Sequence, residues 1–146
     1  MSDSRRKFLQ RVGVIVAGGV TAGAFLEGCA SGGPTVYRYA PTGEIIDLFL
    51  GWYPELYKTG GAVELQLTGT ESSIIVLRVA FDRFTAVSPV CRHKGCKVAL
   101  KENMFKCTCH GSKYGLDGAL IAGPAEEPLV SYRTEYRETS LRIFLS

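Results

Sequence analysis

The sequence predicts a small all-β domain of antiparallel strands, preceded by an N-terminal export signal. Three observations carry the prediction. From Glu44 onward the apolar residues recur mostly with a period of two, runs of β-branched residues are separated by turn residues, and the chain has only 146 residues. A period of two places alternate side chains on opposite faces of a strand, as in a half-buried sheet. A chain of this length is expected to form one domain.

The composition is that of an ordinary globular protein, with 46% hydrophobic and 21% charged residues. It excludes a disordered, collagenous or polytopic membrane protein. The formal charge of +3 arises largely at the N-terminus: without residues 1–28, the 17 Lys/Arg and 14 Asp/Glu fall to 13 and 12. Because the remaining charge is close to neutral, no nucleic-acid partner is expected.

The first 28 residues differ from the rest and are expected to be an export signal or an N-terminal anchor. A basic stretch precedes the uncharged run Val12–Leu26, which as a helix would span about 22 Å and fall short of the hydrocarbon core. A charged region followed by a short apolar region is typical of export signals. The stretch Ser4–Gln10, with Arg5-Arg6, resembles the twin-arginine signal, which exports folded proteins. A general secretory signal and a retained anchor helix are the alternatives.

Cys29 is a candidate for lipidation, because Leu26-Glu27-Gly28-Cys29 resembles a lipobox. Glu27 departs from that pattern, which usually has a small or apolar residue there. Residues 29–43 are rich in Gly, Pro and Ser at their start and are expected to be a flexible tether. The protein is therefore expected at the periplasmic face of a bacterial inner membrane, held by a lipid or by an N-terminal helix.

The body of the chain, residues 44–146, supplies the expected strands. Val63–Leu67 alternates apolar and polar residues, which predicts a strand with Glu64 on its polar face. One further segment, Ile45–Tyr57, has room for a helical turn that Pro54 limits. The remaining expected elements are strands at Ser73–Ala80, Phe84–Val87 and Ser140–Leu145, a hairpin of Lys97–Leu100 with Met104–Cys107, and a turn at Asp117-Gly118.

Both histidines and four of the five cysteines fall in two short segments, Cys91–Cys96 and Cys107–Tyr114. C-x-H in the first and C-x-x-H in the second offer two thiolates and two imidazoles, a ligand set that suits zinc or iron–sulfur. A zinc site would leave two cysteines without a role and has no need of export in the folded state. Because the sequence has no other histidine, a Ser/His/Asp triad is hard to build.

The two segments closely resemble the cluster-binding loops of the Rieske [2Fe–2S] family. The resemblance extends to Ser88-Pro89-Val90 before them and to Gly123-Pro124-Ala125 after them. It implies a Rieske-type antiparallel β-sandwich over residues 44–146, with a small cluster-binding subdomain and one [2Fe–2S] cluster per chain. The cluster loops would span residues 88–114, and residues 123–125 would form a loop that covers the cluster.

The resemblance also implies the ligands of the cluster. Cys91 and Cys107 would hold one iron as thiolates, and His93 and His110 would hold the other iron through imidazole nitrogens. Two neutral imidazoles in place of two thiolates leave the cluster less negative, so it accepts an electron more readily; Rieske centres span about −150 to +300 mV. No residue is assigned a catalytic role.

Four more residues receive a role by the same resemblance. Cys96 and Cys109 would form a disulfide that pins the two loops together, which requires an oxidising compartment and agrees with export. Ser112 and Tyr114 stand where high-potential members of the family place hydroxyl groups that hydrogen-bond a cluster sulfide and a cysteine sulfur. Such bonds stabilise the added electron and raise the reduction potential.

The resemblance predicts a high-potential electron-transfer protein, the iron–sulfur subunit of a quinol-oxidising cytochrome bc-type complex, with cytochrome b and a c-type cytochrome as partners. The alternative is a carrier for another periplasmic oxidoreductase, such as a molybdenum enzyme of the arsenite oxidase kind. Lys94 favours the alternative, because quinol-oxidising subunits usually have an apolar residue there. Six basic residues lie between residues 92 and 113, either as a ring that steers an acidic partner or as a solvated surface.

Overall fold

The computed structural model describes residues 32–146, and the expectations for the export signal and for Cys29 concern residues outside this range. No helix within the described part is long and apolar enough to cross a membrane. Residues 32–146 form strands and two short 3₁₀ turns, in the order β1 (Thr35–Tyr39), β2 (Ile45–Phe49), η1 (Leu50–Trp52), η2 (Pro54–Tyr57), β3 (Ala62–Leu67), β4 (Ser73–Ala80), β5 (Arg83–Val87), β6 (Val98–Lys101), β7 (Met104–Cys107), β8 (Lys113–Tyr114), β9 (Leu120–Ala122), β10 (Ser131–Arg137) and β11 (Ser140–Phe144).

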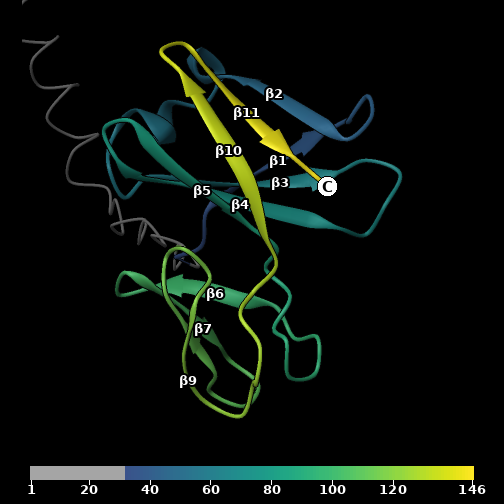
Figure 1. The fold of residues 1–146 in the computed structure, drawn as a ribbon, viewed down its shortest axis with the longest axis vertical. Helices are drawn as coiled ribbons and strands as arrows, with labels where there is room; N and C mark the ends of the chain where they lie inside the picture. The colour runs from purple at the N-terminus through teal and green to yellow at the C-terminus, as the bar shows by residue number, and fades with distance from the viewer. Residues whose placement is uncertain (1–31) are drawn as a thin grey trace, which may run out of the picture. The chain divides into compact units, whose positions relative to one another are not determined.

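Seven strands form one sheet in the order β1-β3-β4-β5-β10-β11-β2. The sheet curls until β2 and β11 lie over β1, β3 and β4, which makes the two layers of a sandwich (Figure 1). The alternating apolar residues of these strands fill the space between the layers, as the period of two predicts. The side chains at the centre of this core are 0% exposed: Ile46, Leu56, Val63, Leu65, Val76, Leu141 and Ile143.

One strand lies within the segment expected to be a tether. Thr35–Tyr39 forms β1 and pairs with β3 in parallel, from Thr35 opposite Val63 to Tyr39 opposite Leu67. This pair departs from the antiparallel expectation, whereas the other strand pairs of the described chain are antiparallel. The ordered domain therefore begins well before Glu44, and fewer residues separate it from Cys29 than the sequence suggests.

The segment Ile45–Tyr57 is a strand followed by two single turns rather than a helix. Its first residues pair with β11 from Ile45 opposite Phe144 to Phe49 opposite Ser140. Pro54 occupies the first position of η2, where a residue without an N–H costs no hydrogen bond. The two turns place the apolar side chains of Leu50, Tyr53 and Leu56 in the core.

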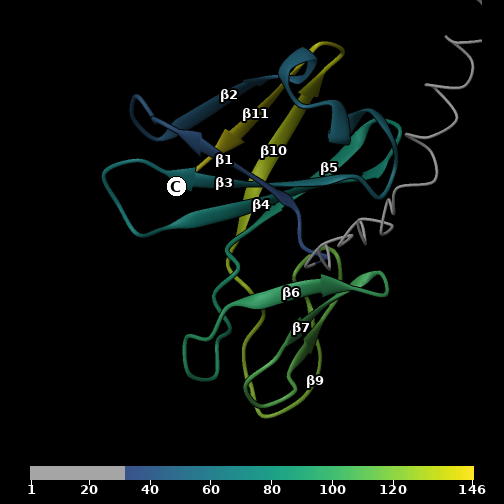
Figure 2. The same cartoon turned by 180° about the vertical axis from the view of Figure 1, so that it is seen from behind.

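A second sheet, in the order β6-β7-β8-β9, is inserted between the end of β5 and the start of β10. Both views place it beside the seven-stranded sheet, below β4 and β5 (Figures 1 and 2). A second apolar cluster lies where the two sheets meet and contains Val98, Phe105 and Tyr114 from the small sheet with Ile75 and Val87 from the large one. This insertion is the small subdomain that the resemblance implies.

Glu64 lies inside the protein, contrary to the polar, outward position that the alternation of β3 predicts. Its side chain is 4% exposed and forms an ion pair of 2.7 Å with Nζ of Lys97, just before β6. The prediction from alternation is wrong here because the small subdomain covers the second face of β3. A buried carboxylate is costly unless it is paired, and Lys97 supplies the opposite charge. The ion pair ties the small subdomain to the large sheet.

Candidate metal centre

The two Cys/His segments fold into loops with the same backbone hydrogen bonds. In the first loop the Cys91 N–H donates to the Cys96 carbonyl at 2.8 Å, and the Gly95 N–H donates to the Cys91 carbonyl at 3.0 Å. The second loop repeats both bonds, with Cys107 in the place of Cys91 and residues 111 and 112 in the places of 95 and 96. Gly95 and Gly111 both have positive φ, which glycine adopts at no steric cost. Each loop therefore turns tightly around its first cysteine.

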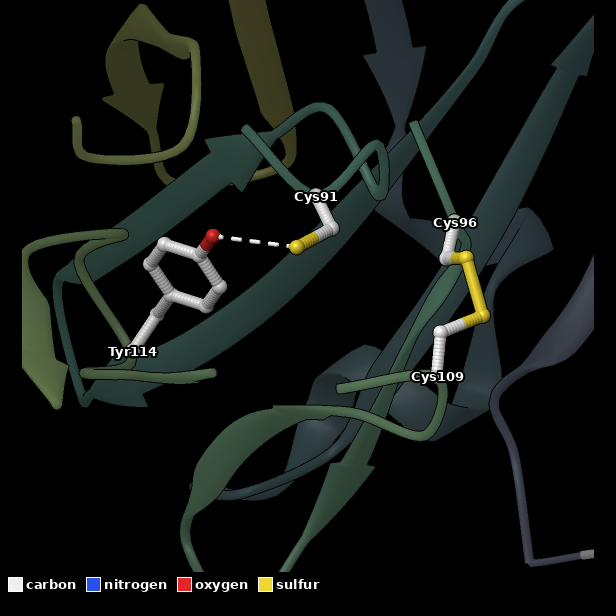
Figure 3. The surroundings of a disulfide bond; sticks show 4 residues. All are labelled: Cys91, Cys96, Cys109 and Tyr114. Carbon is white, nitrogen blue, oxygen red and sulfur yellow. Dashed lines mark hydrogen bonds between the residues drawn. A yellow bond between two sulfur atoms is a disulfide. The ribbon is translucent and has the colours of Figure 1, made fainter. Parts of the chain in front are cut away.

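A disulfide joins Cys96 of the first loop to Cys109 of the second. The sulfur of Cys107 lies with these two sulfurs in a group whose members are all within 4.8 Å of one another. Because two members of that group are bonded to each other, only Cys107 retains a thiol. Figure 3 shows the disulfide apart from Cys91, whose sulfur points toward Tyr114 instead. The disulfide thus holds the loops together without using the two cysteines implied as ligands.

The free thiols and the imidazoles form a donor set suited to a metal centre. Cys91 and Cys107 are free and buried, at 2% and 3% exposure. The rings of His93 and His110 face each other edge to face, with their centroids 4.8 Å apart. Nδ1 of His93 is buried and has no hydrogen-bond partner, which is costly unless another group satisfies it. Two thiols, two imidazoles and an unsatisfied buried nitrogen fit the ligand set of a [2Fe–2S] cluster of the Rieske kind.

Tyr114 links the cysteine of the first loop to the core of the small sheet. Its side chain is 0% exposed, and its hydroxyl oxygen lies 3.3 Å from Sγ of Cys91 (Figure 3). The backbone N–H of Arg92 donates to the same oxygen at 3.2 Å. Because this N–H uses the oxygen as an acceptor, the hydroxyl proton is free to point at the Cys91 sulfur. Burial and the bond to Cys91 raise the pKa of Tyr114, so the phenol keeps that proton.

The surroundings of Cys91 favour the thiolate form. Burial alone raises the pKa of this thiol, since it disfavours the charged form. Hydrogen bonds from the Tyr114 hydroxyl, the backbone at His93 and the side chains of Cys107 and Ser112 act in the opposite direction. Their combined effect is the larger, and the pKa of Cys91 lies below its usual value. The thiolate is the form that binds a metal.

Ser112 connects the second loop to the covering loop. Its hydroxyl oxygen is fully buried and accepts a hydrogen bond of 3.2 Å from the Ala125 N–H. Gly123 has a φ of 115°, and a Cβ atom at this position would lie 2.3 Å from Cα of Ser112. Glycine is therefore required for the close approach. These contacts bring residues 123–125 against the second loop, as expected of a covering loop.

The surface around the loops carries more ion pairs than the sequence suggests. Arg92 pairs with Glu127, just after the covering loop. Lys106 pairs with Glu102 at 2.6 Å. Together with Lys97, three of the six basic residues between 92 and 113 are therefore partly neutralised within the described chain. Sequence reasoning missed the ion-pair roles of Glu64 and Glu127, because each comes from a distant segment and belongs to no motif.

Comparison with known proteins identifies a family that shares this arrangement. Residues 53–133 match the family described as Rieske [2Fe-2S] domain. The match takes in both loops, the covering loop and the small sheet, and extends into β3, β4, β5 and β10 of the large sheet. It covers more than half of the chain.

Curated relatives with similar sequences are named as iron-sulfur subunits of the cytochrome b6-f complex. The chain is 40% identical over 75 residues to the cytochrome b6-f complex iron-sulfur subunit of Chlorobaculum thiosulfatiphilum, which covers 50% of this chain and 41% of the relative. It is 39% identical over 64 residues to the subunit of the same name from Chlorobaculum tepidum, covering 42% and 35%. The chain thus spans less than half of the length of these two relatives. A solved structure of naphthalene 1,2-dioxygenase with bound indole shares the fold, with a TM-score of 0.54, 22% identity and coverage of 70% of this chain and 26% of that chain.

Proposed function

Because the chain belongs to the Rieske [2Fe-2S] domain family, and therefore is an electron-transfer protein with a [2Fe–2S] cofactor, we propose that it is the high-potential iron–sulfur subunit of a quinol-oxidising cytochrome bc-type complex. In this role it passes electrons to a c-type cytochrome. The relatives named as cytochrome b6-f subunits support the type of complex. The single observation that carries the high potential is the buried hydrogen bond between Tyr114 and Cys91.

We assign the ligands as the resemblance implies, with Cys91 and Cys107 on one iron and His93 and His110 on the other. The cluster, when bound, supplies a one-electron redox centre. The chain holds it between two loops that the disulfide fixes in relation to each other. Cys91 and Cys107 lie on the buried side, whereas His93 is half-buried and His110 is exposed. A proton can therefore reach or leave the His110 ring from solvent, as coupled quinol chemistry requires.

The proposed high potential follows from the hydrogen bonds around Cys91. An added electron increases the negative charge on the cysteine sulfurs, and a hydroxyl that points at a sulfur stabilises that charge. Tyr114 is well placed for this because the Arg92 N–H fixes its orientation and the apolar core around its ring excludes water. The low dielectric constant of this apolar core strengthens the hydrogen bond between Tyr114 and Cys91.

A redox titration of the intact holoprotein across pH tests the proposal. We expect a midpoint in the upper part of the Rieske range. Where electron uptake is coupled to proton uptake, the midpoint should fall by about 59 mV per pH unit for each proton taken up with the electron. A midpoint that is low and independent of pH would contradict a quinol-oxidising role.

Replacing Tyr114 by Phe should lower the midpoint potential by roughly 60 mV, which for a one-electron couple corresponds to about 1.4 kcal/mol, the size of one hydrogen bond to a charged group. The substitution removes the hydroxyl and leaves the ring in the core. Tyr132→Phe is the matched control, since Tyr132 is half-buried at the edge of the other core. It should leave the potential unchanged. Equal potentials for the Tyr114→Phe variant and the wild type would remove the role proposed for this hydroxyl.

We further propose that the chain is exported by the twin-arginine pathway and is held at the periplasmic face of the inner membrane. The Arg5-Arg6 pair, the short apolar run and Cys29 support this location. The disulfide between Cys96 and Cys109 also favours an oxidising compartment. Export after folding suits a protein whose cofactor must be inserted before it crosses the membrane.

A second candidate is a carrier for a periplasmic molybdenum enzyme of the arsenite oxidase kind. Lys94 is exposed next to His93, and a recess beside His93 is lined by Arg92, Glu126 and Glu127, which is a poor match to an apolar quinol pocket. Purification of the tagged chain from native membranes distinguishes the two candidates. Co-purification of b-type haem supports the quinol-oxidising complex, and co-purification of molybdenum supports the carrier.

A further inference from the structure

Four large aromatic side chains are exposed at one end of the seven-stranded sheet. Phe49, Trp52, Tyr57 and Phe81 have exposures of 47%, 72%, 60% and 80%. They lie at the end of β2, in η1, in η2 and in the turn between β4 and β5. We call these four residues the aromatic end. So much exposed aromatic surface in one region is unusual for a protein in water and marks a site of interaction.

The four residues are linked by one ring contact, a shared groove and the side chain of Arg78. The rings of Phe49 and Trp52 meet edge to face with centroids 5.7 Å apart. Phe49 and Tyr57 line one groove of about 200 Å³ together with Arg78. The guanidinium of Arg78 also lies 5.5 Å from the centre of the Phe81 ring. The aromatic end is therefore one continuous surface rather than scattered side chains.

Arg78 holds this surface in shape. Its side chain is 7% exposed, with Nε donating to the Phe81 carbonyl at 3.0 Å. Nη1 donates to the carbonyls of Leu56 and Tyr57 at 3.0 and 3.2 Å. These bonds fix the turn that carries Phe81 against the turn that carries Tyr57. The aromatic rings are thus presented outward by a satisfied, buried network and do not depend on loose loops.

β1 begins on the side of the sheet where β3 begins and β4 ends. Thr35, the first residue of β1, lies opposite Val63 near the start of β3. The Arg78 N–H donates to the Gly61 carbonyl at 3.0 Å, immediately before β3. Only five residues lie between Cys29 and Thr35, which are thus six steps apart, and an extended chain spans at most about 3.6 Å per residue. An anchor at Cys29 therefore keeps the start of β1 within about 22 Å of the bilayer.

We propose that the aromatic end contacts the bilayer interface and docks the domain on the membrane surface. The inference rests on the membrane anchoring proposed above, because the short connection holds the start of β1 close to the lipid. Trp and Tyr favour the headgroup region, where the ring is in an apolar environment and its polar group stays hydrated. Lys58 follows Tyr57, Asp82 and Arg83 follow Phe81, and Glu138 lines the groove with Phe49 and Tyr57. These two basic and two acidic residues balance, so the contact depends on the rings and should occur on neutral lipid.

The contact leaves the cluster loops accessible. β5 begins at Arg83, beside the aromatic end, and ends at Val87, from which the chain continues to Cys91 and the first loop. The aromatic end and the small subdomain are thus at opposite ends of this strand. Docking by the aromatic end restricts the orientations of the domain without covering the residues that hold the cluster.

Trp52 provides a direct test, because it is the only tryptophan in the chain. The full-length holoprotein is reconstituted with phosphatidylcholine vesicles, with or without lipids brominated near the headgroup. We expect the emission of Trp52 to shift to shorter wavelength on vesicles and to lose more than half of its intensity to the brominated lipid. A Tyr57→Ser/Phe81→Ser double variant should remain anchored and folded, yet lose most of this quenching. Ile45→Ser, at the far end of β2 and 41% exposed, is the matched control and should behave as the wild type.

Each contrary outcome has a distinct meaning. If the protein sediments with the vesicles but Trp52 remains accessible to iodide and is not quenched by brominated lipid, the docking proposal is wrong and the anchoring stands. If the protein does not sediment with the vesicles, both the anchoring and the docking are wrong. If the emission is already shifted to shorter wavelength without lipid, another part of the chain or a second copy covers the aromatic end, and the lipid contact is again wrong.

Discussion

Replacing Cys107 by Ser in the full-length chain is expected to abolish incorporation of the [2Fe–2S] cluster. The Cys107 thiol is free, and the residue is 3% exposed, so a solvent molecule cannot easily take its place as a ligand. A hydroxyl is a much poorer ligand than a thiolate for iron in such clusters. We expect iron and acid-labile sulfide per chain to fall to background and the electron paramagnetic resonance signal of the reduced protein to disappear.

Cys29→Ser is the matched control, since it makes the same chemical change outside the cluster loops. It should leave the iron content per folded chain unchanged. His110→Gln should resemble Cys107→Ser, because a carboxamide binds iron less well than an imidazole. A Cys107→Ser protein that keeps a full Rieske signal would overturn the proposed ligand set.

The segments that the sequence predicted correctly are those with strong local signals. β4 and β7 have the predicted bounds, and β3 differs by one residue. β4 is rich in β-branched residues, and β3 alternates apolar with polar residues, so both give a strong strand signal. β1 and β10 were not predicted. β10 reads SYRTEYR, and most of its residues are half-exposed, so alternation of Tyr and Thr with charged residues gives a weak apolar signal. β1 is at one edge of the sheet, and the side chains that it turns toward the core are two half-buried tyrosines. Its apolar signal in the sequence is therefore weak.

The site was predicted from sequence to the extent that its parts are local. In each loop, the first cysteine, the histidine and the glycine lie within a span of five residues. The sequence motif therefore determines how they are arranged. The contacts between segments could not be read in this way. Glu64 was expected to face solvent, yet the small subdomain covers it and Lys97 pairs with it. The burial of Glu64 depends on how the two sheets pack against each other. The periodicity of a single strand carries no information about that packing.

Removing the disulfide by the double substitution Cys96→Ser/Cys109→Ser should lower the free energy of unfolding by about 3 kcal/mol. The two cysteines are 13 residues apart in sequence, so the bond closes one loop that contains the small hairpin β6–β7. Without it, the unfolded chain has more conformations available, and the free energy of the unfolded state falls. Urea unfolding of the apoprotein measures the difference as a lower midpoint with little change in slope.

Reduction of the wild-type protein gives an independent control. Wild type in a strong reductant should unfold at the midpoint of the double variant, whereas the double variant should not respond to the reductant. Each single substitution leaves one unpaired cysteine next to Cys107 and invites wrong pairing, so the double variant is the cleaner comparison. Equal stabilities for the oxidised wild type and the double variant would show that the disulfide does not stabilise the fold.

The disulfide should also control how long the cluster is retained. It is the one side-chain cross-link in the described chain between the loop of Cys91 and His93 and the loop of Cys107 and His110. Without it, the contacts of the Tyr114 hydroxyl and the shared apolar cluster hold the loops together. We therefore expect reductant to increase the rate of iron release from the wild-type holoprotein, and the double variant to release iron at the faster rate with or without reductant. Since release requires the two loops to separate, the Tyr114→Phe variant should keep the slow, reductant-sensitive rate of the wild type. An iron-release rate that is indifferent to reductant in the wild type would mean that the loops stay together through these other contacts, and that the disulfide acts on the unfolded chain alone.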